Sequence, residues 1–444
     1  MNVYNKPWLS GNLRVSDNKR YLQNGDTPFF WLGDTAWLLF NKLSLEETYT
    51  YLKNRKEKGY NVIQTTLVHV PGQSTIDGAT ALIEDDFARP NLADGYWEHV
   101  DQVVKMAEDL GLYMGLLPNW GSCFVKNEIM TVESVVPYVE FLTKRYAKHP
   151  NIIWITGGDV RGSVNPTLFR LMGETFKKND PDALVTFHPF GRTCSSLWFN
   201  DETWLDFNMF QSGHRSYNQS SLGAWDDNKE QETFYGEDNY KYVIRAHSNE
   251  NIKPVVDAEP SYEQIPHGLH DDTQPYWQAF DVRRYAYWSV FAGAMGFTYG
   301  SNAVMQFYND LSKKGAYGVK EVWMDALHHV GGSHMKHLLT LMNDIDYTKG
   351  LPAQQLLLGE EKEKYERVAV FAAENYILAY DYLGEEFSID LSSYQEKTLQ
   401  AYWFDPTTGV YSYFTEIRNQ KHLSVKPIKR LDGGNDWVLV LLEN

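Results

Sequence analysis

The chain has 444 residues, of which 43% are hydrophobic and 22% are charged, and its formal net charge is −17 at pH 7. This acidic balance argues against a nucleic-acid or anionic-membrane partner, since both need clustered Lys and Arg, and it is compatible with a neutral substrate. The length exceeds the usual limit for one hydrophobic core, so we expect one large domain and one small domain.

Short apolar runs alternate with amphipathic helical patterns over most of the chain. After a hairpin formed by Leu13–Val15 and residues 20–23, a helix begins at Ser44, which forms a capping box with Glu47, and ends at Gly59. The apolar runs cover residues 29–37, 61–68, 112–120, 151–159, 183–190, 204–214, 253–263 and 295–301. Eight strands that alternate with helices imply parallel pairing and a closed (β/α)8 barrel, the TIM barrel fold.

The pattern changes near Gly350. A helical pattern over residues 323–342 predicts the last barrel helix, whereas the later segments, such as RVAVFAAE and YILAYDYLG, are short, strand-like and separated by turn residues. Such segments predict a small C-terminal antiparallel β-sandwich. We therefore expect two domains, a barrel with its N-terminal hairpin over residues 1–348 and a β-sandwich over residues 349–444.

Several classes of site and location have no support in the sequence. Cys123 and Cys194 are the only cysteines, so at most one disulfide can form and a cysteine zinc site is excluded. The chain has no phosphate-binding loop and no Gly-x-Ser-x-Gly elbow. We expect no cofactor and no membrane span, and no signal peptide opens the sequence.

Four histidines in the segment HHVGGSHMKH suggest a metal site by composition alone. They are His328, His329, His334 and His337. Their spacing matches no standard zinc motif, and they fall on the last predicted barrel helix, away from the other candidate residues. We expect this cluster to lie on the surface and to bind no metal.

Polar and aromatic residues follow the apolar runs at the strand ends where such barrels carry their active sites. They are Asp34, Asn119, Trp120, Asp159, His188, Gln211, His214, Glu259 and Tyr299. Asp159 and Glu259 end the fourth and seventh strands, which lie across the barrel mouth, so their carboxyl groups can converge on one bound group. A retaining glycosidase needs such a pair at a separation of about 5 Å, one acting as an acid and one as a nucleophile.

The two glycines before Asp159 explain why a buried strand ends on a carboxylate. Gly157 and Gly158 permit a tight turn without side-chain bulk, which would deliver Asp159 into the barrel mouth. We therefore predict Asp159 as the general acid/base and Glu259 as the nucleophile. Each residue alone could instead cap a helix or pair with an arginine.

The remaining candidates are predicted to contact substrate. Asp34 either hydrogen-bonds sugar hydroxyls or caps the following helix, and His188 either binds substrate, braces a catalytic carboxylate or is structural. Trp37 and Trp120 either stack on a sugar ring or pack under loops. Further strand-end contacts are expected from Asn119, Gln211 and Tyr299.

Four segments also resemble a known family. They are RVSDNKRYLQNGDTPFFWLGDTAW, WITGGD, VVDAEPSYE and AYWFDPTTGVY with the later DWVLVL. Together they resemble the apiosidase-like glycoside hydrolases, family 140, over nearly the whole chain. The resemblance implies a barrel with a C-terminal β-sandwich of the type labelled collagen-binding, and a retaining mechanism with Asp159 as acid/base and Glu259 as nucleophile.

The resemblance also implies a substrate and a location. Such enzymes act on terminal apiose in pectic side chains, so the expected partner is an oligosaccharide or polysaccharide. A periplasmic or secreted location is implied, with a cytoplasmic one left open. The larger clan of barrel glycosidases carries an Asn-Glu pair at the fourth strand, where this chain has Gly158 and Asp159. The shorter acid suggests the hypothesis that the site accommodates a furanose or a different leaving-group angle.

Three alternatives compete with this interpretation. A non-catalytic glycan-binding barrel protein would need no matched acid and nucleophile, and a barrel glycosidase of different sugar specificity would share both. A metal-dependent amidohydrolase usually needs a His-x-His pair at the first strand, which WLGDTAW does not contain. Sugar, linkage, exo or endo action and oligomeric state stay open at this point.

Overall fold

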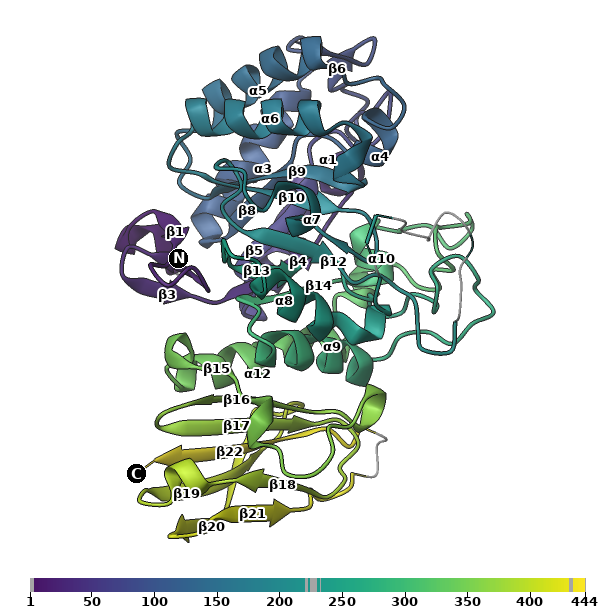
Figure 1. Cartoon of the computed structure of the whole chain (residues 1–444). Helices are drawn as coiled ribbons and strands as arrows, with labels where there is room; N and C mark the ends of the chain where they lie inside the picture. The colour runs from purple at the N-terminus through teal and green to yellow at the C-terminus, as the bar shows by residue number, and fades with distance from the viewer. Residues whose placement is uncertain (1–3, 220–222, 224–229, 232, 431–433, 444) are drawn as a thin grey trace.

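A barrel of parallel strands ringed by helices lies above an antiparallel sheet (Figure 1). The computed structural model describes residues 4–219, 223, 230–231, 233–430 and 434–443. This architecture confirms the predicted fold class, a (β/α)8 barrel followed by a small antiparallel β domain. Within the described residues, no helix is both long and apolar enough to cross a membrane.

The eight predicted barrel strands are all present, although several are shorter than the apolar runs that predicted them. They are β4 (Trp31–Thr35), β5 (Val62–Thr66), β8 (Tyr113–Leu117), β9 (Ile152–Val160), β10 (Leu184–Pro189), β12 (Asn208–Gln211), β13 (Val255–Asp257) and β14 (Gly296–Tyr299). Hydrogen-bonded neighbours run parallel from β10 through β9, β8, β5, β4, β14 and β13 to β12. The ring closes where the backbone N–H of Asp206, just before β12, donates to the carbonyl oxygen of Val185 in β10 at 2.9 Å. A short strand, β11 (Thr193–Cys194), pairs antiparallel with β12.

The main helices cover the outside of the barrel. They are α2 (Leu45–Glu57), α3 (Tyr96–Leu110), α5 (Val132–Tyr146), α6 (Pro166–Asn179), α8 (Asn239–His247), α9 (Ala279–Phe291) and α12 (Val330–Asp344). Single turns occur at α1 (Leu39–Lys42), α4 (Gly121–Phe124), α7 (Ser196–Phe199), α10 (Asn302–Met305) and α11 (Trp323–Ala326). The predicted capping box is present at the start of α2, where Ser44 accepts the backbone N–H of Glu47 and the Glu47 carboxylate accepts that of Ser44.

The last predicted barrel helix is wrong as one continuous element, because residues 323–342 form α11 and α12 with a break between them. The break has a physical cause at the start of α12. There the buried carboxylate of Glu263 accepts the backbone N–H groups of Gly331 and Gly332 at 3.2 and 3.1 Å. These contacts satisfy donors that would otherwise lack partners at a helix N-terminus, so the helix begins again at this point.

The N-terminal hairpin is part of a three-stranded sheet at the N-terminal end of the barrel. Its strands are β1 (Leu13–Val15), β2 (Leu22–Asn24) and β3 (Thr27–Phe29). The rings of Trp8 and Phe29 lie 5.2 and 5.3 Å from the ring of Tyr113, the first residue of β8. This sheet therefore covers the end of the barrel opposite to the loops near α10 (Figure 1). A further short hairpin, β6 (Leu82–Ile83) and β7 (Asp86–Pro90), lies in the segment after β5.

The C-terminal domain is built from two antiparallel sheets. The larger sheet has the order β15 (Leu351–Pro352), β16 (Val368–Ala373), β17 (Tyr376–Asp381), β22 (Trp437–Glu443), β19 (Thr398–Phe404) and β20 (Tyr411–Arg418). The smaller one pairs β18 (Phe387–Asp390) with β21 (His422–Val425). Apolar residues of both sheets, among them Ile377, Leu441 and Ile389, form one buried cluster between them.

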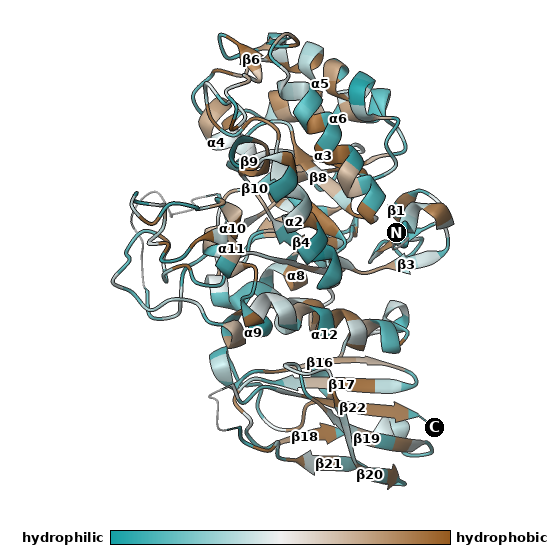
Figure 2. Cartoon of the chain, turned by 180° about the vertical axis from the view of Figure 1, so that it is seen from behind, coloured by the Kyte–Doolittle hydropathy of each residue, from teal (hydrophilic) through white to brown (hydrophobic). Residues whose placement is uncertain are grey.

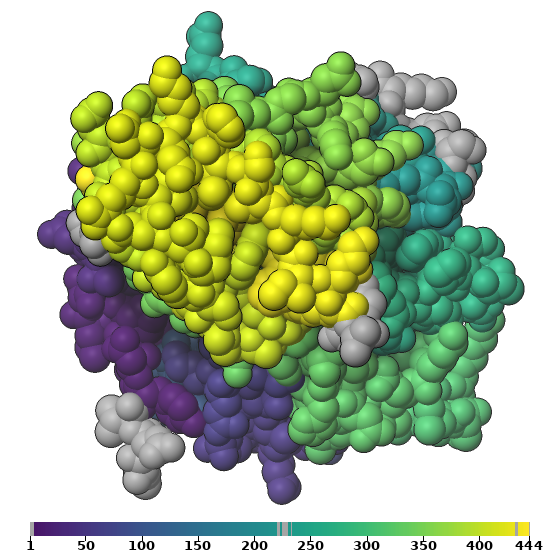
Figure 3. Space-filling view, turned by 90° about the horizontal axis from the view of Figure 1, so that it is seen from below, coloured from purple at the N-terminus to yellow at the C-terminus, as the bar shows by residue number. Residues whose placement is uncertain are grey.

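The other face of the larger sheet packs on the barrel helices α9 and α12, which lie directly above β16 and β17 (Figure 2). The rings of Tyr287 and Tyr380 stack with centroids 4.7 Å apart. Arg283 and Asp436 form a buried ion pair with two contacts of 2.8 and 2.6 Å. Seen from below, the C-terminal sheets cover a large part of that face beside the N-terminal segment (Figure 3). The interface is therefore a continuous core with a buried charge pair.

The histidine cluster lies partly in this interface, so its predicted surface position is wrong for two of its members. His334 Nδ1 lies 2.9 Å from Nη1 of Arg283, and the ring of His337 packs against Gly409 of the C-terminal domain. Burial and the nearby Arg283 charge lower the pKa of His334 to about 4. Across the described part of the chain, no group of three or more His, Cys, Asp or Glu side chains could hold a metal ion.

Candidate active site

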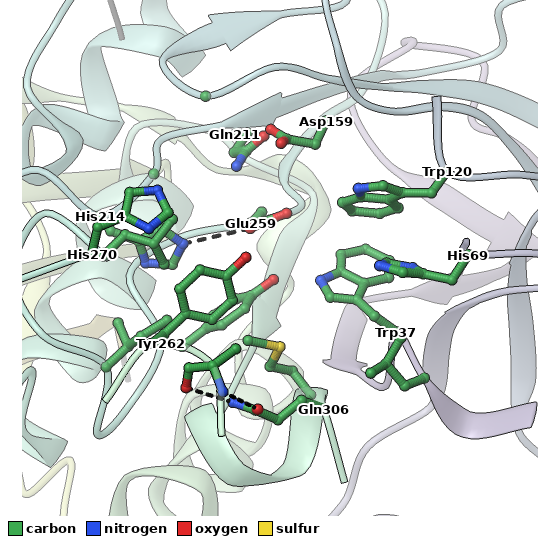
Figure 4. A pocket seen from close by; sticks show the side chains of 18 of the residues that line it. Trp37, His69, Trp120, Asp159, Gln211, His214, Glu259, Tyr262, His270 and Gln306 are labelled. Atoms are coloured by element: carbon green, nitrogen blue, oxygen red, sulfur yellow. Dashed lines mark hydrogen bonds and ion pairs between the residues drawn. The ribbon is translucent and has the colours of Figure 1, made fainter. Parts of the chain in front are cut away.

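A cavity of about 540 Å³ opens at the C-terminal ends of the barrel strands. Asp159 and Glu259 both line it, and the side chains of Trp37 and Trp120 face them across the space (Figure 4). A pocket of this size and composition, with a few converging polar groups among aromatic rings, is typical of a small-molecule site.

Three successive residues with left-handed backbone carry Asp159 into the cavity. The φ angles of Gly157, Gly158 and Asp159 are 89°, 100° and 47°. A Cβ atom on Gly157 would lie 2.3 Å from the carbonyl oxygen of His188 in the neighbouring strand, so only glycine fits there. The tight turn expected from the two glycines is present. A non-glycine residue such as Asp159 in this region stores strain, which is a feature of functional sites.

The surroundings of Asp159 favour its protonated form. Burial raises the pKa of Asp159 well above its usual value, and the negative charge of Glu259 raises it further. A hydrogen bond with Gln211 and the charge of Arg161 oppose this rise without cancelling it. This shift is in the direction that a general acid needs.

The surroundings of Glu259 favour its ionised form. His188 Nε2 lies 3.4 Å from Oε2 of Glu259, and His214 Nε2 lies 3.5 Å from Oε1. Burial alone would raise the pKa of Glu259, but the two imidazoles outweigh it and lower this pKa to about 2. The surroundings of the two carboxyl groups in this cavity thus favour opposite protonation states.

An aromatic wall faces the two carboxyl groups. The rings of Trp37 and Trp120 lie 4.8 Å apart, and His69 stacks on Trp120 at the same distance. Trp37 also packs edge-on against His188, the partner of Glu259. The two tryptophans therefore combine the roles that the sequence left open, since they line the cavity and also pack against neighbouring side chains.

The structure brings together seven of the ten residues that the sequence suggested for the site. His188 lies behind Glu259 as a brace rather than in the lining, and the six that line the cavity are Asp159, Glu259, Trp37, Trp120, Gln211 and His214.

The three other sequence-predicted residues lie outside the lining. For Asp34 and Tyr299 their pairing with other side chains argues against the expected substrate contact, and for Asn119 that contact stays a prediction. Asp34 is fully buried and pairs with Arg55 and Tyr51 of α2 at 2.7 and 2.6 Å. Tyr299 donates its hydroxyl to Glu263, and Asn119 is buried with 1% of its surface exposed. Asp34 and Tyr299 are register partners in β4 and β14, and both point toward the helix layer instead of the mouth.

Several cavity residues were missed because they belong to loops. Arg192, Arg215, Tyr262, His270 and Gln306 all line the cavity. Arg192 donates its backbone N–H to the carbonyl oxygen of Gln211, and the ring of Tyr262 lies 5.1 Å from that of His214. The closeness of Tyr262 to Glu259 in sequence could have indicated it. The others depend on loop paths that strand patterns do not define.

Comparisons with known proteins agree with this geometry. Residues 16–349 match the family described as "Apiosidase-like, catalytic domain", and residues 351–442 match a "Putative collagen-binding domain of a collagenase". One solved structure, titled "Glycoside hydrolase", is 40% identical over 99% of both chains, with a TM-score of 0.93. A second, from Bacteroides vulgatus ATCC 8482 and titled a glycoside hydrolase family 5 structure, is 38% identical over 99% of this chain and 95% of that one, with a TM-score of 0.92. Among the curated proteins, none matches. The chain therefore belongs to the apiosidase-like family and is a glycoside hydrolase.

Proposed function

We propose that the chain is a retaining glycoside hydrolase in which Asp159 is the general acid/base and Glu259 is the nucleophile. The observation that carries this proposal is the opposite environment of two carboxyl groups in one cavity. Burial and a neighbouring negative charge favour the protonated form of Asp159, whereas two imidazoles favour the ionised form of Glu259. Environments that push two pKa values apart are the usual basis for such paired roles.

The proposed reaction has two steps. The Glu259 carboxylate attacks the anomeric carbon while Asp159 gives its proton to the leaving oxygen, which forms a covalent glycosyl-enzyme. Once Glu259 is esterified, its negative charge no longer raises the pKa of Asp159. Asp159, which gave up its proton in the first step, is then ionised and acts as the base in the second step. There it takes a proton from the water that attacks the anomeric carbon and displaces Glu259.

We further propose a terminal sugar of a complex plant polysaccharide as the substrate, with apiose on a pectic side chain as the first candidate. The family description supports the sugar, and the sequence motifs support the assignment to family 140. The lining supports a terminal sugar, because His69, Trp120 and His214 follow the second, third and sixth barrel strands and enclose the cavity. The positively charged Arg192 and Arg215 in the same lining suit a substrate that carries carboxylates.

The proposal is tested with fragmented pectic polysaccharide and three proteins, the wild type, Asp159→Ala and Glu259→Ala. We expect apiose from the wild type, and a loss in kcat of about 10²–10⁴-fold for Asp159→Ala. Asp17→Ala is the control, because that carboxylate is 96% exposed. Release of a different sugar would replace apiose in the proposal, and glycan binding without any release would contradict it.

Added azide tests the two roles separately. In Asp159→Ala, azide can intercept the glycosyl-enzyme and give a glycosyl azide of retained configuration. In Glu259→Ala, azide can take the place of the removed carboxylate and give the inverted product. The reverse pattern would exchange the two roles, and an inverted sugar from the wild type would rule out the retaining mechanism.

A further inference from the structure

The C-terminal domain reaches the loop that forms one wall of the cavity. This loop follows β12 and carries His214, which contacts Glu259, and Arg215, which lines the cavity. On the barrel side the loop is fixed by two backbone hydrogen bonds, from Gly213 to the carbonyl oxygen of Glu259 at 3.1 Å and from Gly268 to that of His214 at 2.8 Å. Its next residues are held by a different set of contacts.

The Tyr217 hydroxyl donates to Asp238 at 2.7 Å, and the Tyr217 backbone is held by the fully buried carboxylate of Glu237. Its Oε1 accepts the backbone N–H of Tyr217 at 2.7 Å, two residues beyond Arg215. The same oxygen accepts the hydroxyl of Tyr365, from the segment before β16, at 3.1 Å. Its Oε2 accepts Nη2 of Arg284 in α9 at 2.5 Å. One carboxylate therefore joins the cavity loop, a barrel helix and the C-terminal domain.

Tyrosine rings of the C-terminal domain also cover the cation of this pair. The guanidinium carbon of Arg284 lies 4.8 Å from the ring centroid of Tyr365 and 4.7 Å from that of Tyr382. A buried ion pair is stable only when its remaining donors and acceptors are satisfied. Without the C-terminal domain, the Arg284–Glu237 pair would lack the Tyr365 hydroxyl and the two tyrosine rings that cover it. The C-terminal domain therefore completes the surroundings of this ion pair.

We propose that Tyr365 is a positioning residue through which the C-terminal domain holds His214 and Arg215 in the cavity wall. It acts through the Glu237 carboxylate on the Tyr217 amide and touches no reacting atom. The C-terminal domain is in this way a structural part of the active site as well as a separate sheet.

The first test is the Tyr365→Phe variant of the full chain, measured by hydrogen exchange at residues 212–219. We expect the Tyr217 amide to exchange about tenfold faster than in the wild type, which corresponds to one lost hydrogen bond to a charged group. The control is Tyr394→Phe, another half-buried tyrosine of the same domain, which loses a hydrogen bond of 2.7 Å to the carbonyl oxygen of Ala373. Unchanged exchange at Tyr217, or an equal change in the control, would overturn the proposal. This test does not depend on the reaction.

The second test rests on the proposed function. With the natural substrate, Tyr365→Phe should raise KM about fivefold, because the loosened loop carries Arg215. It should also move the acid limb of the kcat/KM profile to higher pH, because the same loop carries His214. Tyr394→Phe should change neither KM nor the acid limb. An unchanged KM together with an unmoved acid limb in Tyr365→Phe would overturn the positioning role. If the wild type releases no sugar, the proposed function fails, and the exchange measurement still decides the role of Tyr365.

Discussion

His214 Nε2 lies 3.5 Å from Oε1 of Glu259, the carboxylate oxygen that His188 does not contact. Each oxygen of the candidate nucleophile therefore has its own imidazole, one from β10 and one from the loop after β12. Burial and the imidazoles act on the pKa of Glu259 in opposite directions, and the imidazoles prevail. Removal of either imidazole should therefore allow burial to raise the pKa of Glu259.

The pH dependence of catalysis should report this balance. In His214→Ala, burial is opposed by one imidazole instead of two, so the pKa of Glu259 rises and the carboxylate is protonated at higher pH. We expect the acid limb of the kcat/KM profile to move to higher pH by about one unit or more. The profile is measured between about pH 3 and 8, with the exposed His328→Ala as control. An unmoved acid limb would show that His214 does not set the ionisation of Glu259.

Gly157, the first of the two glycines before Asp159, can be compared with Gly78, a glycine outside the site. Gly157 and Gly78 have φ angles of 89° and 88°, but a Cβ atom would collide with His188 at the first position and meet nothing within 4 Å at the second. Gly78→Ala should lower the free energy of unfolding by about 1 kcal/mol from backbone strain alone. Gly157→Ala should cost about 2 kcal/mol more from the collision, and should also lower kcat by displacing His188 and Asp159. Urea denaturation measures the free energy of unfolding of both variants, and kinetics measures their kcat. Equal losses in the free energy of unfolding would mean that the end of β9 tolerates a side chain at Gly157.

The corrected role of Asp34 leads to a stability prediction. Asp34→Asn leaves the buried Arg55 without its counter-ion, and should lower the free energy of unfolding by about 3 kcal/mol. Its KM should stay within about twofold of the wild type, because Asp34 lies outside the cavity lining. The exposed Arg14–Asp17 pair provides the control, since Asp17→Asn should cost less than about 1 kcal/mol. A large rise in KM for Asp34→Asn would restore the substrate contact that the sequence suggested.

The barrel could be predicted from sequence because its strands are buried on both faces. Each parallel strand is then a continuous apolar run, and eight such runs separated by helical patterns leave few alternatives. The strand ends were overestimated, as at residues 204–214, where β12 covers only Asn208–Gln211. Polar loop residues next to a buried strand are buried here as well, so polarity alone does not show where a strand stops.

The candidate site was predictable only in part, for a related reason. A strand-end residue points to the mouth or to the helix layer according to register, and a shift of one residue reverses the direction. The sequence does not show that Asp34 and Tyr299 face the helices while Glu259 faces the cavity. Loop residues such as Arg192 and His270 reach the site along paths that no periodic pattern describes. The glycine pair before Asp159 was informative because its geometry is local.

The interface between the barrel and the C-terminal sheet should be as stable as a domain core. Asp436→Asn would leave the buried Arg283 without its charge partner, and we expect a loss of about 3–5 kcal/mol in the free energy of unfolding. Glu385→Gln, which breaks an exposed pair with Lys429, should leave the free energy of unfolding nearly unchanged. Urea denaturation of both variants checks the difference. A loss below 1 kcal/mol for Asp436→Asn would indicate that water reaches Arg283.

The stacking of Tyr287 on Tyr380 and the burial of Asp436 limit how the barrel and the C-terminal sheet can be separated or exchanged. A barrel cut at residue 349 would present aromatic rings of α9 and an unpaired Arg283 to water, a surface suited to aggregation. Exchange of the C-terminal sheet for one from another enzyme would succeed only if the replacement brought its own partners for Arg283 and Tyr287. In protein engineering, and in recombination between related genes, the barrel and its C-terminal sheet should therefore be exchanged together.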